Sequence, residues 1–287
     1  MTSPAAKPKR LTDFNGQIPA LSLGRVEKVE WTNDEFKLDG VVTYPPDFAA
    51  GRTYPLVLYV HGGPAAASKE SFGVLPQLFA ARGWVVFEPN YRGSDNLGSK
   101  FMRGIYNDAG AGPGRDVMAG IEMLKKRGFV DESRMAVSGW SYGGYMTTWM
   151  IGHYPIWKAA VAGAAVTDWM DQYNIGDSNV SRAGQFGGSP WTGDFEKAYR
   201  EQSPISAASK IRTPTLIMSD TGDVRVPIPQ SFKLYHALRD NNVPVQFIAY
   251  PVSGHSPGDP VRQQDVNRRY VEWLDKYLES PATSQAK

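Results

Sequence analysis

Apolar and polar residues alternate along two short segments near the start of the chain. Residues 25–31 read RVEKVEW, with Val29 and Trp31 on the same face, and residues 38–44 read LDGVVTY. Alternation with a period of two is typical of strands, and the prolines at positions 45 and 46 end the second segment. The pattern therefore predicts two strands that pair as an antiparallel hairpin.

From residue 55 onward, short apolar runs alternate with segments of helical spacing. The run PLVLYV at residues 55–60 is uninterrupted, which favours a strand buried on both faces. Further strands are predicted at residues 84–87, 134–137, 159–166, 215–218 and 245–250. Helices are predicted at residues 71–82, 112–127, 142–151, 229–239 and 262–278. This order predicts an α/β fold with a mostly parallel central sheet and helices on both faces.

Residues 167–213 interrupt this alternation. The stretch is rich in Trp, Tyr, Gly and Asp, and we interpret it as an insertion over the carboxyl ends of the strands, where open α/β sheets bind ligands. Residues 1–24 show neither period and are expected to form an N-terminal tail, and residues 281–287 a disordered C-terminal tail. The predicted organisation is one α/β domain over residues 25–280.

The composition narrows the possible function classes. The chain has 287 residues, of which 41% are hydrophobic and 21% charged, and this excludes disorder as a description of the whole chain. Lys and Arg number 31 against 29 Asp and Glu, so the net charge of +2 lacks the basic excess of a nucleic-acid-binding protein. No apolar run approaches the ~20 residues of a transmembrane helix, so we expect neither nucleic acid nor a membrane as a partner.

Sulfur and imidazole ligands are scarce in this chain. It has no cysteine, which excludes disulfides, cysteine-ligated zinc and thiol catalysis, and its four histidines have no close metal-ligand spacing. We therefore expect neither a metal nor a cofactor. Lys7, Lys9 and Arg10 make the N-terminus basic, but no apolar segment follows, so we expect no secretory signal and a cytoplasmic location.

The segment GWSYGG at residues 139–144 lies between a predicted strand and a predicted helix. This is the setting of the nucleophile elbow, in which glycines two residues before and after the serine leave room for a tight turn. The turn raises the Ser141 hydroxyl above the sheet, at a helix N-terminus that favours developing negative charge. Ser141 is therefore the candidate nucleophile.

A serine nucleophile needs a base and an acid, which follow it along the chain when the order is Ser, Asp, His. His255 follows the last predicted strand in the loop SGHSPGD, where a base can reach back over Ser141, whereas His236 lies inside a predicted helix. The acid is expected after the preceding strand, where the loop SDTGDVRVP offers Asp220 and Asp223. We favour His255 as the base and Asp223 as the acid.

The oxyanion hole of such a site requires two backbone donors. The N–H of Tyr142, the residue after the nucleophile, is one of them. The other is expected from the loop HGGP at residues 61–64, whose glycines let the backbone approach a substrate closely. These donors would stabilise the negative charge that develops on the substrate carbonyl oxygen.

In these motifs the sequence resembles the prolyl oligopeptidase family of serine hydrolases, and most closely its acylaminoacyl-peptidase-like branch. The segments that carry the resemblance are HGGP at 61–64, NYRGSDNLG at 90–98, GWSYGGYM at 139–146, SPISAASKIRTPTLIM at 203–218, GDVRVP at 222–227 and SGH at 253–255. They occur in the family's order, between about Val26 and the end of the last predicted helix. The resemblance implies an α/β-hydrolase fold with Ser141 as nucleophile, Asp223 as acid and His255 as base.

The resemblance also implies further site residues. The N–H groups of Gly63 and Tyr142 would form the oxyanion hole. Arg225, two residues after the acid, matches a position that contacts the substrate. Val166 and Trp169 match positions that line the pocket for the residue before the scissile bond.

The chain departs from the family in two ways. Relatives commonly have His-Gly where this chain has Ser219-Asp220, which adds a second carboxylate near Asp223. The alternative to a substrate contact for Arg225 is a surface ion pair with Asp220 or Asp223. Family members usually carry a β-propeller over the active site, for which 287 residues leave no room, and residues 1–24 resemble the link that leaves its last blade. The chain is thus either the catalytic domain of a longer parent or a stand-alone descendant.

We therefore expect a serine hydrolase that cleaves amide or ester bonds of small peptide or acyl ester substrates through an acyl-enzyme, as a peptidase of the prolyl oligopeptidase type. One alternative is a stand-alone carboxylesterase for short-chain acyl esters, because amides are the harder substrates. An alternative of another class is a non-catalytic interaction module that keeps the fold. The apolar surface left uncovered without a propeller predicts association into a homo-oligomer.

Overall fold

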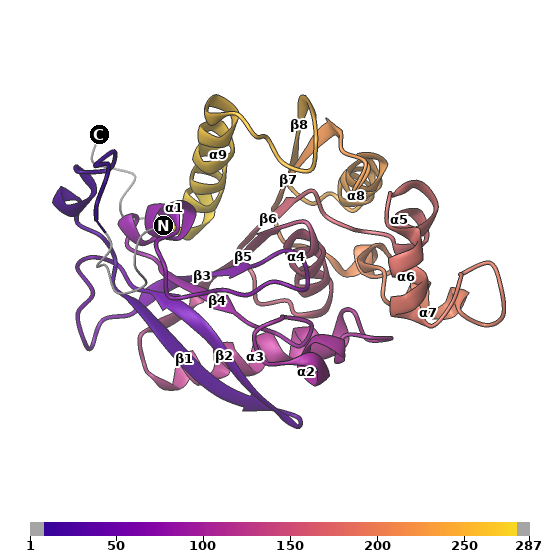
Figure 1. Ribbon diagram of the computed structural model, residues 1–287, viewed down its shortest axis with the longest axis horizontal. Coiled ribbons are helices and arrows are strands. Elements are labelled where there is room, and N and C mark those ends of the chain that lie inside the picture. The colour runs from indigo at the N-terminus through magenta and orange to yellow at the C-terminus, as the bar shows by residue number, and fades with distance from the viewer. Residues whose placement is uncertain (1–8, 280–287) are drawn as a thin grey trace.

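The computed structural model describes residues 9–279, and an eight-stranded sheet runs through its centre (Figure 1). The strands are β1 (Val26–Asn33), β2 (Phe36–Thr43), β3 (Tyr54–Val60), β4 (Val85–Pro89), β5 (Val130–Trp140), β6 (Ala159–Gly163), β7 (Thr215–Gly222) and β8 (Val245–Ser253). Their order across the sheet is β1-β2-β4-β3-β5-β6-β7-β8. β1 pairs with β2, and β2 with β4, in antiparallel fashion, and the other neighbouring pairs are parallel. The predicted hairpin and the predicted mostly parallel sheet are both confirmed.

Helices cover both faces of this sheet, as predicted (Figure 1). The α-helices are α1 (Val74–Ala81), α2 (Ser99–Arg103), α3 (Ala111–Lys126), α4 (Tyr142–His153), α5 (Trp169–Ile175), α6 (Asn179–Phe186), α7 (Glu196–Glu201), α8 (Pro229–Asp240) and α9 (Pro260–Leu278), and the 3-10 helices are η1 (Ile18–Ala20) and η2 (Pro204–Lys210). Helices α1 and α9 bury their apolar side chains in the core on one face of the sheet. Helices α3, α4 and α8 do so in the core on the other face.

Strand β3 shows why both faces must be covered. Leu56, Leu58 and Val60 belong to the core beneath α3, α4 and α8, whereas Val57 belongs to the core beneath α1 and α9. All four side chains are completely buried. Because successive side chains of a strand point to opposite faces, an uninterrupted apolar run requires an apolar layer on each side. The prediction made from PLVLYV is therefore confirmed.

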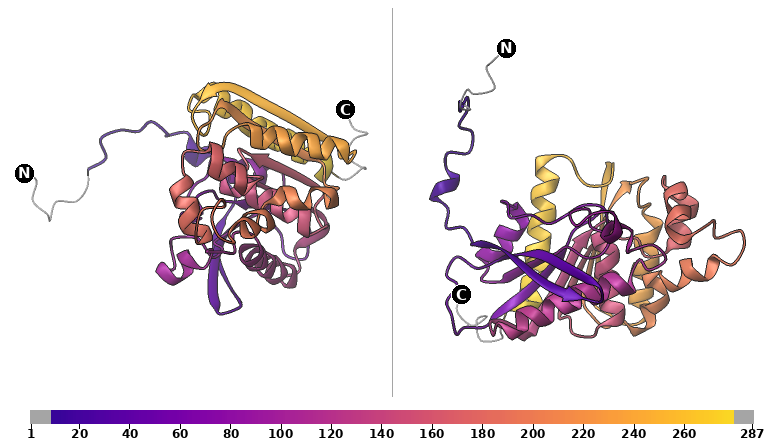
Figure 2. Two further views of the ribbon diagram at one scale, coloured as in Figure 1. Left: turned by 90° about the vertical axis from the view of Figure 1, so that its right-hand side faces the viewer. Right: turned by 60° about the horizontal axis from the view of Figure 1, so that its bottom comes forward.

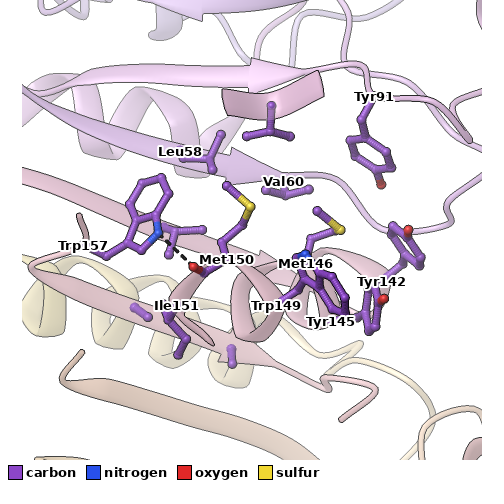
Figure 3. Packing of buried hydrophobic residues seen from close by; sticks show 14 of the residues in the cluster. Leu58, Val60, Tyr91, Tyr142, Tyr145, Met146, Trp149, Met150, Ile151 and Trp157 are labelled. Carbon is purple, nitrogen blue, oxygen red and sulfur yellow. Dashed lines mark hydrogen bonds between the residues drawn. The ribbon is translucent and has the colours of Figure 1, made fainter. Parts of the chain in front are cut away.

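Helix α4 is buried around its whole circumference. Every residue of the helix except the last is buried. Figure 3 shows Met146 and Met150 on the side of α4 that faces Leu58 and Val60 of β3. A helix that is apolar all round is held by packing on every side. Ser141, which immediately precedes α4, is thus attached to a firmly packed element.

Several predicted boundaries are wrong, and two of the errors have a clear physical reason. The helix predicted from residue 71 begins at Val74, because Pro76 is tolerated only in the first turn and an earlier start would place it in the helix interior. Phe72, which fits the helical spacing, lies outside the helix and is half exposed. The strand predicted to reach residue 166 ends at Gly163, because Ala164 has a φ of 38°, which turns the chain out of the sheet.

The stretch predicted to be an insertion, residues 167–213, forms α5, α6, α7 and η2. The three α-helices lie together at one end of the sheet, at the right of Figure 1. Trp169 of α5 and Arg182 of α6 line the same cavity as Ser141, which follows β5. The prediction that this stretch covers the carboxyl ends of the strands is therefore confirmed.

The described part of the N-terminal tail, residues 9–24, extends away from the body of the molecule in both views of Figure 2. It contains the short η1 helix and exposes Leu11 and Phe14. Two hydrogen bonds between the backbone of Gly24 and the side-chain amide of Gln77 attach the end of this tail to α1. The predicted tail at 281–287 lies outside the described residues, as do positions 1–8. No helix in the described range has the length and apolar character needed to cross a membrane.

Candidate active site

Ser141 is the single residue between β5 and α4. Its backbone has a φ of 64° and a ψ of −121°, a combination that residues with side chains rarely adopt and that costs on the order of 1–3 kcal/mol. Its N–H donates a hydrogen bond of 2.9 Å to the carbonyl of Gly163. The surrounding structure thus holds a strained turn in place, and strain of this kind clusters at functional sites.

Three glycines make this turn possible. A Cβ atom on Gly139 or Gly143 would lie 2.5 or 2.1 Å from the carbonyl oxygen of Val60. A Cβ atom on Gly144 would lie 2.3 Å from the carbonyl oxygen of Gly163. Any side chain at these positions would collide with backbone atoms. The prediction that the turn needs glycine two residues before and two residues after the serine is confirmed.

Two short contacts join Ser141, His255 and Asp223 in a row. His255 Nε2 lies 2.7 Å from Ser141 Oγ, and His255 Nδ1 lies 2.7 Å from Asp223 Oδ2. A carboxylate acceptor at Nδ1 favours the tautomer whose Nε2 lone pair faces the serine hydroxyl. The structure therefore brings together the three residues predicted as nucleophile, base and acid, from the turn after β5 and the loops after β8 and β7.

The Asp223 side chain is completely buried, and both of its oxygens have partners. Oδ1 accepts hydrogen bonds from the backbone N–H groups of Arg225 at 2.8 Å and Val226 at 2.9 Å. Oδ2 accepts from His255. A buried carboxylate needs such partners because it has lost its hydration. One oxygen thus closes the turn after β7, and the other orients the histidine.

Asp220, the other candidate acid, lies near the end of β7 and does not contact His255. Its side chain is buried, and neither oxygen has a hydrogen-bond partner anywhere in the described part of the chain. Burial raises the pKa of the Asp220 carboxyl to about 6, and the negative charge of Asp223 acts in the same direction. The second carboxylate noted in the sequence is therefore close to the site but outside the row of contacts.

The HGGP loop lies directly beside the elbow. A Cβ atom on Gly62 would lie 2.9 Å from the carbonyl oxygen of Trp140, so the two backbones approach closely. Gly63 and Tyr142 line the same cavity as Ser141. Within residues 9–279, neither of their backbone N–H groups donates a hydrogen bond to another backbone group. Both predicted oxyanion donors therefore remain available for a substrate carbonyl.

His61 supports this loop. Its ring stacks on Tyr91 with 4.5 Å between centroids, and its Nε2 lies 2.9 Å from Ser94 Oγ. The Tyr91 hydroxyl donates a hydrogen bond of 2.7 Å to the His61 carbonyl. Burial lowers the pKa of His61, so its ring is neutral near pH 7. Of the other histidines, His153 ends α4 and His236 is exposed on α8.

A cavity of about 290 Å³ opens beside Ser141. Its lining consists of Gly63, Ser141, Tyr142, Val166, Trp169, Gln172, Arg182, Arg225, Val226 and His255. The three residues predicted to contact substrate, Val166, Trp169 and Arg225, all belong to this lining. Across the described residues, no three His, Cys, Asp or Glu side chains gather as they would around a metal ion.

Sequence reasoning missed three residues of this lining, Gln172, Arg182 and Val226. No motif marks Gln172 or Arg182, which lie in the stretch whose internal fold no periodic pattern predicts, and Val226 lies in the GDVRVP motif without a predicted role. Gln172 donates a hydrogen bond of 2.6 Å from Nε2 to the carbonyl of Arg225. The ion pair considered for Arg225 also proves different, because its partner is Asp177, with Nε 2.6 Å from Oδ1.

Known proteins match this chain over most of its length. Residues 70–281 match the prolyl oligopeptidase family. An uncharacterized peptidase of Bacillus subtilis (strain 168) is 30% identical over 277 residues, which cover 94% of this chain and 42% of that protein. Dipeptidyl-peptidase 5 of Porphyromonas endodontalis is 30% identical over 252 residues, which cover 86% of this chain and 36% of that protein.

A solved structure is similar as well. The acylaminoacyl peptidase of Pyrococcus horikoshii superposes with a TM-score of 0.88 at 26% sequence identity, covering 95% of this chain and 45% of that one. This chain spans less than half the length of all three relatives. The likeness of fold confirms the prediction of an α/β-hydrolase fold.

Proposed function

Because the chain belongs to the prolyl oligopeptidase family, we propose that it is a serine hydrolase that cleaves amide or ester bonds of small peptide and acyl substrates. Residues 25–280 would form its catalytic domain. The observation that carries this proposal is the row of two 2.7 Å contacts from Ser141 through His255 to Asp223. Ser141 and His255 line a cavity. Gly63 and Tyr142, whose N–H groups are the proposed oxyanion donors, line the same cavity.

Acylation begins when the Ser141 hydroxyl attacks the substrate carbonyl. His255 Nε2 takes the hydroxyl proton while Oγ forms a bond to the carbonyl carbon. The carbonyl electron pair moves to the oxygen, where the N–H groups of Gly63 and Tyr142 stabilise the charge. When the carbonyl reforms, the C–N or C–O bond breaks, and His255 gives its proton to the leaving amine or alcohol.

Deacylation repeats these steps with water as the nucleophile. His255 takes a proton from water, the hydroxide oxygen bonds to the acyl carbon, and the same donors hold the oxyanion. Collapse breaks the bond to Ser141 Oγ, which recovers the proton from His255. Asp223 stays ionised throughout and stabilises the imidazolium that forms in both halves of the reaction.

Peptides are the favoured substrate class because the relatives named above are peptidases. A carboxylesterase acting on short-chain esters would use the same residues, with an alkoxide leaving group that departs more readily than an amine. A non-catalytic module has less support. Such a module would have no use for the strained backbone of Ser141, which folding must stabilise elsewhere.

Two substrates and one variant test the proposal. The chain is assayed with a short-chain p-nitrophenyl ester and an N-acetyl-amino-acid p-nitroanilide, each beside Ser141→Ala. Turnover of both, lost in the variant, supports a peptidase, and ester turnover alone supports the carboxylesterase. No turnover, combined with no labelling of folded protein by a fluorophosphonate, overturns the proposal and leaves the non-catalytic module.

We propose in addition that the chain associates with a second copy of itself. Phe72, Val74, Leu78 and Val261 are apolar and exposed near a groove between α1 and α9. Apolar patches larger than a few hundred Å² are rare on monomers and mark interaction surfaces. Sedimentation velocity over micromolar concentrations tests this. A dimer or larger species is expected, and a monomer at every concentration would contradict it.

A further inference from the structure

Two guanidinium groups line the cavity beside Ser141, and they differ in how their charge is balanced. Arg225 forms an ion pair with Asp177, with Nε 2.6 Å from Oδ1. Arg182, from α6, has no carboxylate within 4.0 Å among the residues that the structure describes. Its Nη1 donates to the neutral side chain of Gln185 at 2.7 Å, and its Nε is buried without any acceptor. The cavity therefore holds one positive charge that the protein leaves unbalanced.

The guanidinium of Arg182 lies beside an aromatic ring. Its guanidinium lies 5.3 Å from the centre of the Trp169 ring. Burial lowers the pKa of Arg182, and the positive charge of Arg225 acts in the same direction. An arginine nonetheless stays protonated in proteins, so the charge persists. Arg182 is partly buried, and a charge that loses hydration without gaining an ionic partner is unfavourable, so an anion bound in the cavity would relieve this.

The two carboxylates that contact lining residues of the cavity are already engaged, and the unpartnered Asp220 does not belong to the lining. Asp177 pairs with Arg225, and Asp223 accepts hydrogen bonds from His255 and two backbone N–H groups. Neither can turn to Arg182 without breaking those contacts. The balancing anion must therefore come from outside the chain, and the open space next to Arg182 is the substrate cavity itself.

The position of Arg182 relative to Ser141 decides which part of a substrate it meets. Trp169, over which it lies, belongs to the core on the α4 face of the sheet. Trp140, whose indole donates to the His255 carbonyl, packs against the core on the α9 face. Arg182 and the histidine loop thus contact tryptophans that belong to different cores of the sheet. Since His255 must face the leaving group, the side of Arg182 receives the acyl part.

We propose that Arg182 makes the cavity selective for an acyl part that carries a carboxylate, as in a peptide with Asp or Glu immediately before the scissile bond. This inference rests on the proposed function and names its substrate class. A volume of about 290 Å³ holds one such side chain. A guanidinium can bind a carboxylate through two parallel N–H···O bonds, which a neutral amide cannot match.

The test compares substrates that differ only in charge. N-acetyl-Glu p-nitroanilide is compared with N-acetyl-Gln p-nitroanilide, and the corresponding p-nitrophenyl esters are run in parallel. We expect kcat/KM to favour the Glu substrate at least tenfold, because hydrogen bonds to charged groups contribute that much or more. N-acetyl-Gln-Gly, which carries its carboxylate on the leaving side, should show no such advantage over its C-terminal amide. Equal turnover of Glu and Gln substrates, or preference for the leaving-side carboxylate, would overturn the inference.

Three variants separate selectivity from folding. Arg182→Gln should lose the preference for Glu, because kcat/KM falls much more for the Glu substrate than for the Gln substrate, and Arg182→Lys should keep part of the preference. Arg200→Gln on α7 is the matched control, because Arg200 is exposed and outside the cavity lining. If Arg182→Gln lowers turnover of both substrates equally, Arg182 is structural and the inference fails.

A binding measurement tests the role of Arg182 even if the wild-type chain has no hydrolytic activity. Ser141→Ala is titrated by calorimetry with N-acetylglutamate and N-acetylglutamine. Tighter binding of the glutamate, lost in the double variant with Arg182→Gln, supports the carboxylate site whether or not the wild-type chain hydrolyses anything. Equal binding of the two ligands would overturn it. Lack of turnover together with selective binding would contradict only the proposed function.

Discussion

The indole Nε1 of Trp140 donates a hydrogen bond of 2.7 Å to the backbone carbonyl of His255, across 115 positions of the chain. Trp140 is the residue before Ser141, so one hydrogen bond ties the histidine loop to the turn that carries the nucleophile. The ring has room because it lies over Gly163, where a Cβ atom would be 2.1 Å from Trp140 Cε3. This hydrogen bond thus restrains the backbone of His255 relative to Ser141, and it helps to set the distance between His255 Nε2 and Ser141 Oγ.

Replacing Trp140 by Phe should lower kcat while leaving the fold intact. Phenylalanine keeps an aromatic ring but has no donor, so the loop loses its tie, and a displacement of about 1 Å at a reacting group can reduce the rate roughly 100-fold. We expect a 10- to 100-fold fall in kcat and a loss of about 1 kcal/mol in the free energy of unfolding. Ester kinetics and urea unfolding measure the two effects, and an unchanged kcat would contradict this role of Trp140.

Asp223→Asn should abolish most activity with little effect on the turn. The amide oxygen can still accept from the N–H groups of Arg225 and Val226, but the amide nitrogen donates to His255 Nδ1. The ring then presents a protonated Nε2 to Ser141 and cannot act as a base. We expect kcat to fall roughly 10⁴-fold. Asp223→Ala is the comparison, and it should also lower the urea midpoint. Activity of Asp223→Asn within tenfold of wild type would refute the assignment.

The tight packing of the elbow predicts a large difference between two glycine substitutions. Gly143→Ala places a methyl group 2.1 Å from the Val60 carbonyl oxygen and should lower the free energy of unfolding by about 3 kcal/mol or more. Gly184→Ala on α6 meets no atom within 4 Å and should be neutral or stabilising by up to ~1 kcal/mol. Both are measured by urea unfolding. Similar values for the two variants would show that the elbow can relax around a side chain.

Because the Asp220 carboxyl is buried, its contribution to the free energy of unfolding should depend on pH. Its pKa is raised to about 6, so between pH 4 and 6 the unfolded chain ionises this group while the folded chain retains the proton. The unfolded state then binds fewer protons, and stability falls as pH rises through this window. Asp220→Asn lacks the ionisation. Its free energy of unfolding relative to wild type should therefore increase from pH 4 to pH 7, by about 1–3 kcal/mol.

Urea unfolding of both chains at each pH provides this comparison. The difference between variant and wild type removes the contributions of all other groups. Asp240→Asn, at an exposed position on α8, controls for the general loss of one carboxylate. A difference for Asp220→Asn that stays constant from pH 4 to pH 7 would mean that the carboxyl is not penalised by burial.

Local patterns predicted the parts of the site that local chemistry determines. Ser141 could be identified because a strained turn needs glycines at fixed spacing, and His255 and Asp223 because each follows a predicted strand that ends at the same edge of the sheet. The start of α1 was misplaced because apolar spacing outweighed Pro76, whose position in a helix is restricted more strictly than any hydrophobic pattern.

The unpaired charge of Arg182 in the cavity could not be predicted from local patterns. Arg182 lies in a short helix of the stretch 167–213, and whether an arginine faces solvent or a cavity depends on how α5, α6 and α7 pack together. The partner of Arg225 depended on the same packing, since Asp177 lies between α5 and α6. No periodicity encodes these long-range relationships, and only the folded chain reveals them.

Ser141 and His255 have very different mechanical support. Helix α4, to which the serine is attached, is enclosed by the core, whereas the histidine stands on a loop beyond the edge strand β8 with 32% of its side chain exposed. We therefore expect warming or mild denaturant to displace the base before it melts the element that holds the nucleophile. A stored or heated preparation can retain its full spectroscopic signature and still be inert, and turnover, not ellipticity, is the sensitive measure of its integrity.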